Sequence, residues 1–310
     1  MLTSFFAKSG TINYLLLALS IPLVVIAKGF YLEGTNLKIS SLLLGTLVAL
    51  VIVLAFLLFD FILRKNKLTQ ANTYGALIFT CLVLTQPLIE NLKVFLTLIV
   101  ALLFYRRLYS LTNEVAIEKK IWDAGFWVFI LALVYPWALL LLAPLAIAIG
   151  SLNQFSWRFA VAPLLAGIAV VLMTAAYSVL DPDASMSVAL LALPSGTPLA
   201  FKWPQQTWLL ALYVLGIVAL LIGALHLPKA RQDTSRASKI HLQWTLYILI
   251  LGLVLMGLMP EAVYGVFLLL VAPQATIILV GLIERQRRMA IKELVLLALL
   301  ILPLIEILLK

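Results

Sequence analysis

Polar residues are scarce within the apolar runs of this 310-residue chain, so each one is a candidate for chemistry or binding. A charged group among apolar residues is costly and marks a functional site by default. Asp60 lies four residues before Arg64, a spacing that also suits an ion pair on one helix face. Glu306 stands in the same relation to the C-terminal lysine. Gln274 directly follows a proline, where its amide can bond a neighbouring helix.

A second set of candidates flanks the apolar runs. Lys28 and Lys202 carry the charge that would hold a phosphate, for instance that of a lipid-linked group. Glu33 and Asp181 are candidate catalytic residues, as a general base or as ligands of a cation. Single charged residues at the ends of apolar runs are also commonly solvated or snorkelling groups. Both interpretations stand.

Disulfide frameworks and metal sites built from cysteines or from several histidines are excluded by residue type. The chain has one cysteine, Cys81, and two histidines, His226 and His241, so neither a disulfide framework nor a multi-histidine metal site can form. It contains no glycine-rich phosphate loop, zinc motif or catalytic triad. We expect no metal and no cofactor, and whether the protein is an enzyme stays open.

Composition places the chain in a membrane. Hydrophobic residues make up 64% of it and the mean hydropathy is +1.14, against about 45–50% apolar residues in soluble domains. The net charge of +9 comes from short basic clusters between apolar runs. This is the pattern of membrane topology, and it argues against nucleic acid as a partner. We predict a single, all-α integral membrane domain over residues 1–310.

Seven apolar runs are long enough to span a bilayer, which takes about 20 residues. They cover residues 12–32, 41–63, 159–180, 207–227, 243–259, 262–283 and 293–309. Two further regions are interrupted: 73–105 near Gln86-Pro87 and Glu90-Asn91, and 124–150 at Tyr135-Pro136-Trp137. Each can form one long helix or two short ones.

The basic residues favour two short helices in each interrupted region. Eleven spans then result, with the N-terminus inside and the C-terminus outside. Cytoplasmic loops hold all but five of the 22 lysines and arginines, whereas a single helix over 124–150 nearly abolishes the bias. We also expect an interfacial helix at about 184–193. We expect a surface helix from Arg106 to Asp123 that is attracted to anionic lipid.

Two stretches carry a family resemblance. Residues 3–14 (TSFFAKSGTINY) and residues 119–129 (KKIWDAGFWVF), the latter followed by Tyr135-Pro-Trp-Ala, resemble a family of uncharacterised bacterial inner-membrane proteins of similar length. Some of its members are labelled carotene-cleaving oxygenases. That class resembles a fold with iron held by several intramembrane histidines, which this chain lacks. The resemblance implies a multi-pass inner-membrane protein and carries over no functional residue.

A weaker similarity links the chain to GT-C membrane glycosyltransferases. The shared features are the short middle spans and an acidic residue, Glu33, in the first outer loop. The chain lacks the acidic motif and the soluble outer domain of that class. We therefore expect a non-catalytic subunit or scaffold in cell-envelope biogenesis, partnered by lipid and by other membrane subunits. The alternatives are a GT-C-like enzyme using a polyprenyl-phosphate-linked sugar and a small-molecule transporter.

Overall fold

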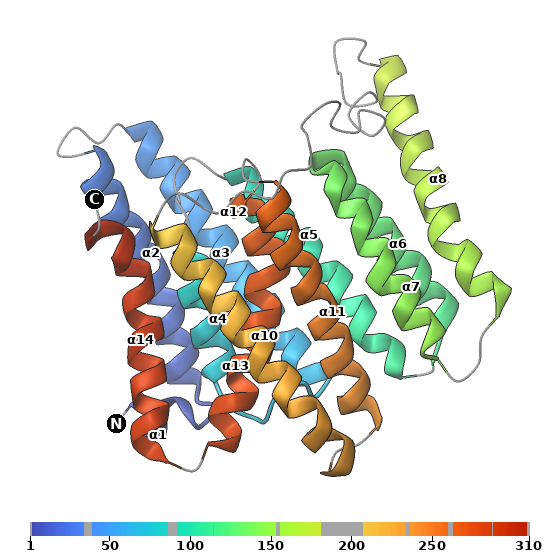
Figure 1. Ribbon diagram of the computed structural model, residues 1–310. Helices are drawn as coiled ribbons and strands as arrows, with labels where there is room; N and C mark the ends of the chain where they lie inside the picture. Colours follow the sequence, from blue (N-terminus) through green and yellow to red (C-terminus); the bar gives the residue numbers. More distant parts are fainter. Residues whose placement is uncertain are drawn as a thin grey trace. The chain divides into compact units, whose positions relative to one another are not determined.

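The computed structural model describes residues 2–33, 39–85, 92–113, 115–152, 156–180, 207–233, 236–259, 263–286 and 288–308. Within these ranges the chain is helical and has no strand, as the sequence predicts (Figure 1). Six helical stretches are long and apolar enough to cross a membrane. Three shorter apolar helical stretches accompany them, at Tyr74–Leu84, Pro136–Gly150 and Leu210–Leu225. This is the make-up of an integral membrane protein.

Contacts between helices divide the chain into two compact units. The first unit contains α1 to α4, the start of α5, α10, the end of α11, and α12 to α14. The bounds of its complete helices are Leu2–Phe6 (α1), Thr11–Glu33 (α2), Ile39–Lys65 (α3), Tyr74–Leu84 (α4), Thr207–Asp233 (α10), Val263–Val266 (α12), Ala272–Arg285 (α13) and Met289–Leu308 (α14).

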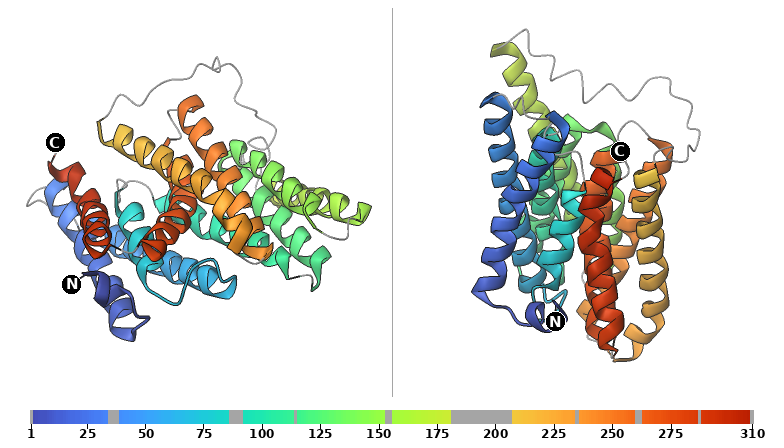
Figure 2. Two further views of the ribbon diagram at one scale, coloured as in Figure 1. Left: turned by 60° about the horizontal axis from the view of Figure 1, so that its bottom comes forward. Right: turned by 90° about the vertical axis from the view of Figure 1, so that its left-hand side faces the viewer.

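The short helix α4 is the centre of the first unit. It packs against α2, α3, α13 and α14, and both views in Figure 2 show α14 near it. All eleven of its residues are buried. A helix of this length rises only about 16 Å, less than a hydrocarbon core of about 30 Å. Neighbouring helices shield its ends, which is the condition under which a short span is tolerated.

The second unit contains the end of α5 (Leu92–Tyr109), α6 (Ile117–Val134), α7 (Leu142–Gly150), α8 (Trp157–Leu180) and the start of α11 (Arg236–Leu258). Two 3-10 segments join these helices: η1 at Ser110–Thr112, and η2 at Pro136–Leu141. Helix α8 packs mainly on α6, and α6, α7 and α8 lie side by side in Figure 1.

The chain breaks where the sequence predicts, at Tyr135-Pro136. Helix α6 ends at Val134, Tyr135 is extended with φ −131° and ψ 96°, and η2 begins at Pro136. A residue before proline is pushed out of the helical region because the proline ring crowds its backbone. Segments η2 and α7 then pack back along α6 (Figure 1). The predicted doubling back of 124–150 is therefore present in the structure.

The prediction of a surface helix from Arg106 to Asp123 is wrong. Helix α5 runs through Arg106 to Tyr109, and a second helix, α6, begins at Ile117. Leu108 and Ile121 are both 0% exposed, so each half is anchored in the interior of the unit. Its charged residues had suggested a surface element, but two of them, Arg107 of α5 and Asp123 of α6, pair with each other and join the two helices. The other expected helix, at 184–193, lies outside the described residues.

Candidate functional site

Lys28, a predicted phosphate ligand, forms a buried hydrogen bond inside the first unit. Its side chain is 2% exposed, and Nζ donates a hydrogen bond of 2.7 Å to the carbonyl oxygen of Leu84. Leu84 is the last residue of α4, where helix carbonyls lack partners within the helix and the dipole favours a cation. Lys28 therefore caps α4 from α2.

Asp60 forms the ion pair that its spacing predicts. Its Oδ2 lies 2.9 Å from Nε of Arg64, and its Oδ1 accepts a 2.9 Å hydrogen bond from the hydroxyl of Tyr14. Arg64 also donates to the Tyr14 hydroxyl and lies over its ring. This cluster joins α2 to the cytoplasmic end predicted for α3. These contacts explain the presence of a charged residue at position 60 without a bound ligand.

Gln274 is 0% exposed and lies in Tyr264–Arg285, the most buried of the six long apolar stretches. The five residues before Ala272, Phe267–Val271, form a π-helical turn. Pro273 has no N–H to donate one turn back, and a wider turn is one way a helix adapts to that loss. Every residue from Val266 to Val280 is buried.

Glu284 is a structural anchor that the sequence reading missed. Its Oε1 accepts hydrogen bonds from the Gln70 backbone N–H at 2.8 Å and from the Asn72 side chain at 2.6 Å. It thereby holds the segment between α3 and α4 against α13. Glu284 directly precedes Arg285, the first residue of a basic cluster. That cluster was interpreted as a signal of membrane topology, so the acid beside it was overlooked. An acid within that cluster was the available clue.

His241 ties α11 to the end of α5 within the second unit. Its Nε2 lies 3.0 Å from both Thr112 Oγ1 and the carbonyl oxygen of Tyr109. The Tyr109 hydroxyl in turn lies 2.9 Å from Thr245 Oγ1, one turn further along α11. The histidine is 6% exposed and serves as a link between helices. No group of three metal-ligating side chains occurs in the described part of the chain.

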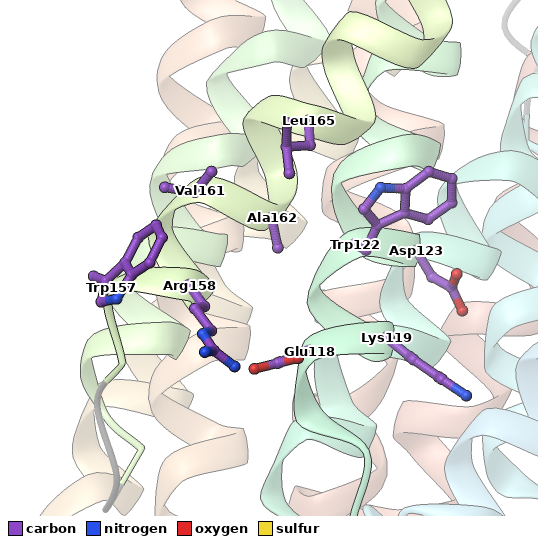
Figure 3. Close-up of a pocket in the computed structure, with 9 residues that line it drawn as sticks. All are labelled: Glu118, Lys119, Trp122, Asp123, Trp157, Arg158, Val161, Ala162 and Leu165. Carbon is purple, nitrogen blue, oxygen red and sulfur yellow. The ribbon is translucent and has the colours of Figure 1, made fainter.

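A groove of about 560 Å³ lies between α6 and α8 in the second unit (Figure 3). Charged groups gather at its mouth, where the Arg158 side chain points toward Glu118. Apolar side chains of α8 line its inner part. The residues that form it are Glu118, Lys119, Trp122, Asp123, Trp157, Arg158, Val161, Ala162 and Leu165. We call this feature the α6–α8 groove.

Four predicted site residues have side chains outside the described part. Glu33 closes α2 and Glu306 lies near the end of α14, but the structure describes neither side chain. Asp181 and Lys202 belong to the segment 181–206, which is not described. Their predicted roles stay predictions. Of the predicted set, the structure places Lys28, Asp60 and Gln274 at separate positions in the first unit.

Comparison of the chain with protein-family models, with curated proteins and with solved structures finds no match to any of them. Function is therefore argued from the geometry above.

Proposed function

We propose that this chain is a non-catalytic subunit or scaffold of the bacterial inner membrane that serves cell-envelope biogenesis. The observation that carries the proposal is the use of ionisable groups within the described helices. Lys28 caps α4, Asp60 pairs with Arg64, and Glu284 holds a connecting segment. These groups are used in contacts that hold the helices and their connections in place, which favours a structural role over catalysis.

A partner surface is available on α8. This helix packs mainly on α6, and outside that contact it exposes Leu164 (59%), Ile168 (56%) and Val171 (49%). These positions follow i, i+4 and i+7 spacing and so form one stripe. In a membrane, helix association depends on packing between such stripes. We propose that this stripe packs against a helix of another subunit, within a membrane topology of eleven spans with basic loops inside.

Site-specific photo-crosslinking in cells tests this proposal. A benzophenone amino acid replaces Val171 on α8 or, as the matched control, Leu54 on α3, which is equally exposed at 49%. We expect a discrete protein adduct of one mass at Val171 and only lipid adducts at Leu54. A protein that gives lipid adducts alone at Leu164, Ile168 and Val171, and runs as a monomer in mild detergent, would contradict the proposal.

The competing enzyme hypothesis makes the opposite prediction at two other residues. A GT-C-like enzyme requires Glu33 or Asp181 for catalysis, whereas a scaffold does not. We expect the Glu33→Gln and Asp181→Asn proteins to complement a deletion strain fully. We also expect each to form the protein adduct from the photo-crosslinker at Val171. Loss of complementation at a normal protein level would favour the enzyme.

A further inference from the structure

The α6–α8 groove opens where both of its helices begin. Helix α6 starts at Ile117 and α8 at Trp157, and residues from the first turns of both line the mouth (Figure 3). Helix N-termini present unpaired N–H groups and a partial positive charge, which favour a bound anion. The exposed Trp157 and the basic residues nearby are typical of the level of lipid headgroups.

The charges at the mouth are balanced. The groove is lined by two acids and two bases, Glu118, Asp123, Lys119 and Arg158. Asp123 already has a partner, because its Oδ2 lies 2.7 Å from Arg107 in α5. Glu118 and Arg158 face each other across the mouth from α6 and α8, and both are solvent-exposed. The Lys119 side chain points away from Glu118 and Arg158 in Figure 3. Between α6 and α8 the mouth therefore offers a ligand one carboxylate and one guanidinium.

The wall of the groove is apolar and continues along α8. Val161, Ala162 and Leu165 form it, and Leu172 lies two turns beyond Leu165 on the same face. Leu165 is 52% and Leu172 64% exposed, so this track is open beside the bundle. It is a different face from the stripe that carries Ile168. Charged groups at one end and an apolar track at the other match the two parts of a phospholipid.

We propose that the α6–α8 groove binds a zwitterionic phospholipid that carries a primary amine, such as phosphatidylethanolamine. Arg158 and the two helix N-termini hold the phosphate, and Glu118 accepts hydrogen bonds from the ammonium group. One acyl chain follows Leu165 and Leu172. Because the pair of Glu118 and Arg158 provides one negative and one positive group, a purely anionic headgroup is disfavoured: the carboxylate of Glu118 would face a like charge. This site requires only that the chain is embedded in a membrane, and it is independent of the scaffold proposal.

Native mass spectrometry of the full-length protein in detergent tests the site. Three lipids with identical acyl chains are added: phosphatidylethanolamine, phosphatidylcholine and phosphatidylglycerol. We expect wild-type protein to retain phosphatidylethanolamine at least about fivefold over phosphatidylglycerol, since a charge-assisted hydrogen bond discriminates by at least that factor. Phosphatidylcholine, which has the charge but no N–H donor, is expected to lie between them.

Three variants assign the effect to the groove. Glu118→Gln is expected to abolish the preference for phosphatidylethanolamine, and Arg158→Gln to lower retention of all three lipids. Arg236→Gln removes one positive charge elsewhere in the second unit and is expected to change nothing. Equal or stronger retention of phosphatidylglycerol by the wild type overturns the proposal, as does an unchanged preference in Glu118→Gln.

Folding does not limit this test. Glu118 is exposed in the first turn of α6, so its neutralisation leaves the packed face of that helix intact. An unchanged elution profile on size exclusion verifies each variant. Retention of none of the three lipids also overturns the proposal and leaves the groove to a protein partner.

Discussion

At the scale of single residues, close helix packing depends on glycine. Gly125 of α6 faces Pro163 of α8, and a Cβ at position 125 would lie 2.7 Å from Cα of Pro163. Backbone atoms cannot yield as the end of a flexible side chain can. Gly125 thus lets α6 and α8, the two helices that form the groove, approach each other closely. Such small residues are the usual means of close approach in membranes.

Gly125→Ala is therefore expected to destabilise the protein by about 1–3 kcal/mol, the cost of overpacking. The control is Gly281→Ala, because a Cβ at Gly281 meets no atom within 4 Å. An alanine there should stabilise α13 by about 0.5–1 kcal/mol through helix propensity alone. Melting temperatures from fluorescence-detected size exclusion compare the two. Equal shifts in the same direction would refute the packing argument.

At the scale of elements, the end of α3 shows how a membrane helix stops. Leu68 N–H bonds the carbonyl of Leu63 at 3.0 Å, and Lys67 N–H bonds that of Arg64 at 3.2 Å. These two bonds form a Schellman motif, which requires a left-handed residue at its second-last position. Lys67 occupies it with φ 51°. A lysine pays a steric penalty there that a glycine avoids.

Lys67→Gly is expected to raise the free energy of unfolding by about 1 kcal/mol, because it relieves the left-handed strain. The matched control, Lys65→Gly, removes the same charge from the last residue of α3 and should lower stability by up to about 1 kcal/mol. Both are measured by thermal unfolding in detergent. A loss of stability in Lys67→Gly would show that its side chain matters more than its backbone.

At the scale of the whole molecule, the helix directions in the first unit bring basic residues from separate parts of the sequence to the same end of that unit. Thr3 of α1 contacts Met289 and Glu293 at the start of α14, and Thr73, which precedes α4, bonds the carbonyl of Phe6. The starts of α4 and α14 and the end of α3 therefore lie at one end, where Lys8, Arg64 and Lys292 are found. The far end of α14 lies a full helix length away.

This arrangement predicts the accessibility of two positions across the membrane. A cysteine at Ser9, introduced with Cys81→Ser, should react with a membrane-impermeant maleimide only after the cells are opened. An epitope tag after Lys310 should be reached from outside in intact spheroplasts. Labelling of both from the same side would disprove an odd number of spans.

The sequence by itself determined the class of the protein and several local events. Hydropathy indicated a lipid solvent, Pro136 marked a candidate break in the 124–150 region, and the spacing of Asp60 and Arg64 suited an ion pair. Each of these depends on residues close in the chain, where covalent geometry and helix periodicity leave few options. Glu33, Asp181 and Lys202 remain predictions of the same kind.

Only the tertiary structure decided which distant groups meet. In the folded chain Lys28 bonds the carbonyl oxygen of Leu84, and Glu284 bonds Asn72. Glu118 of α6 faces Arg158 of α8, although α7 lies between these helices in the sequence. Apolar helices of similar hydropathy carry little information about their neighbours, because lipid and protein offer the same apolar surroundings. Packing shape and a few polar contacts choose the partners, and these appear only when the helices are assembled.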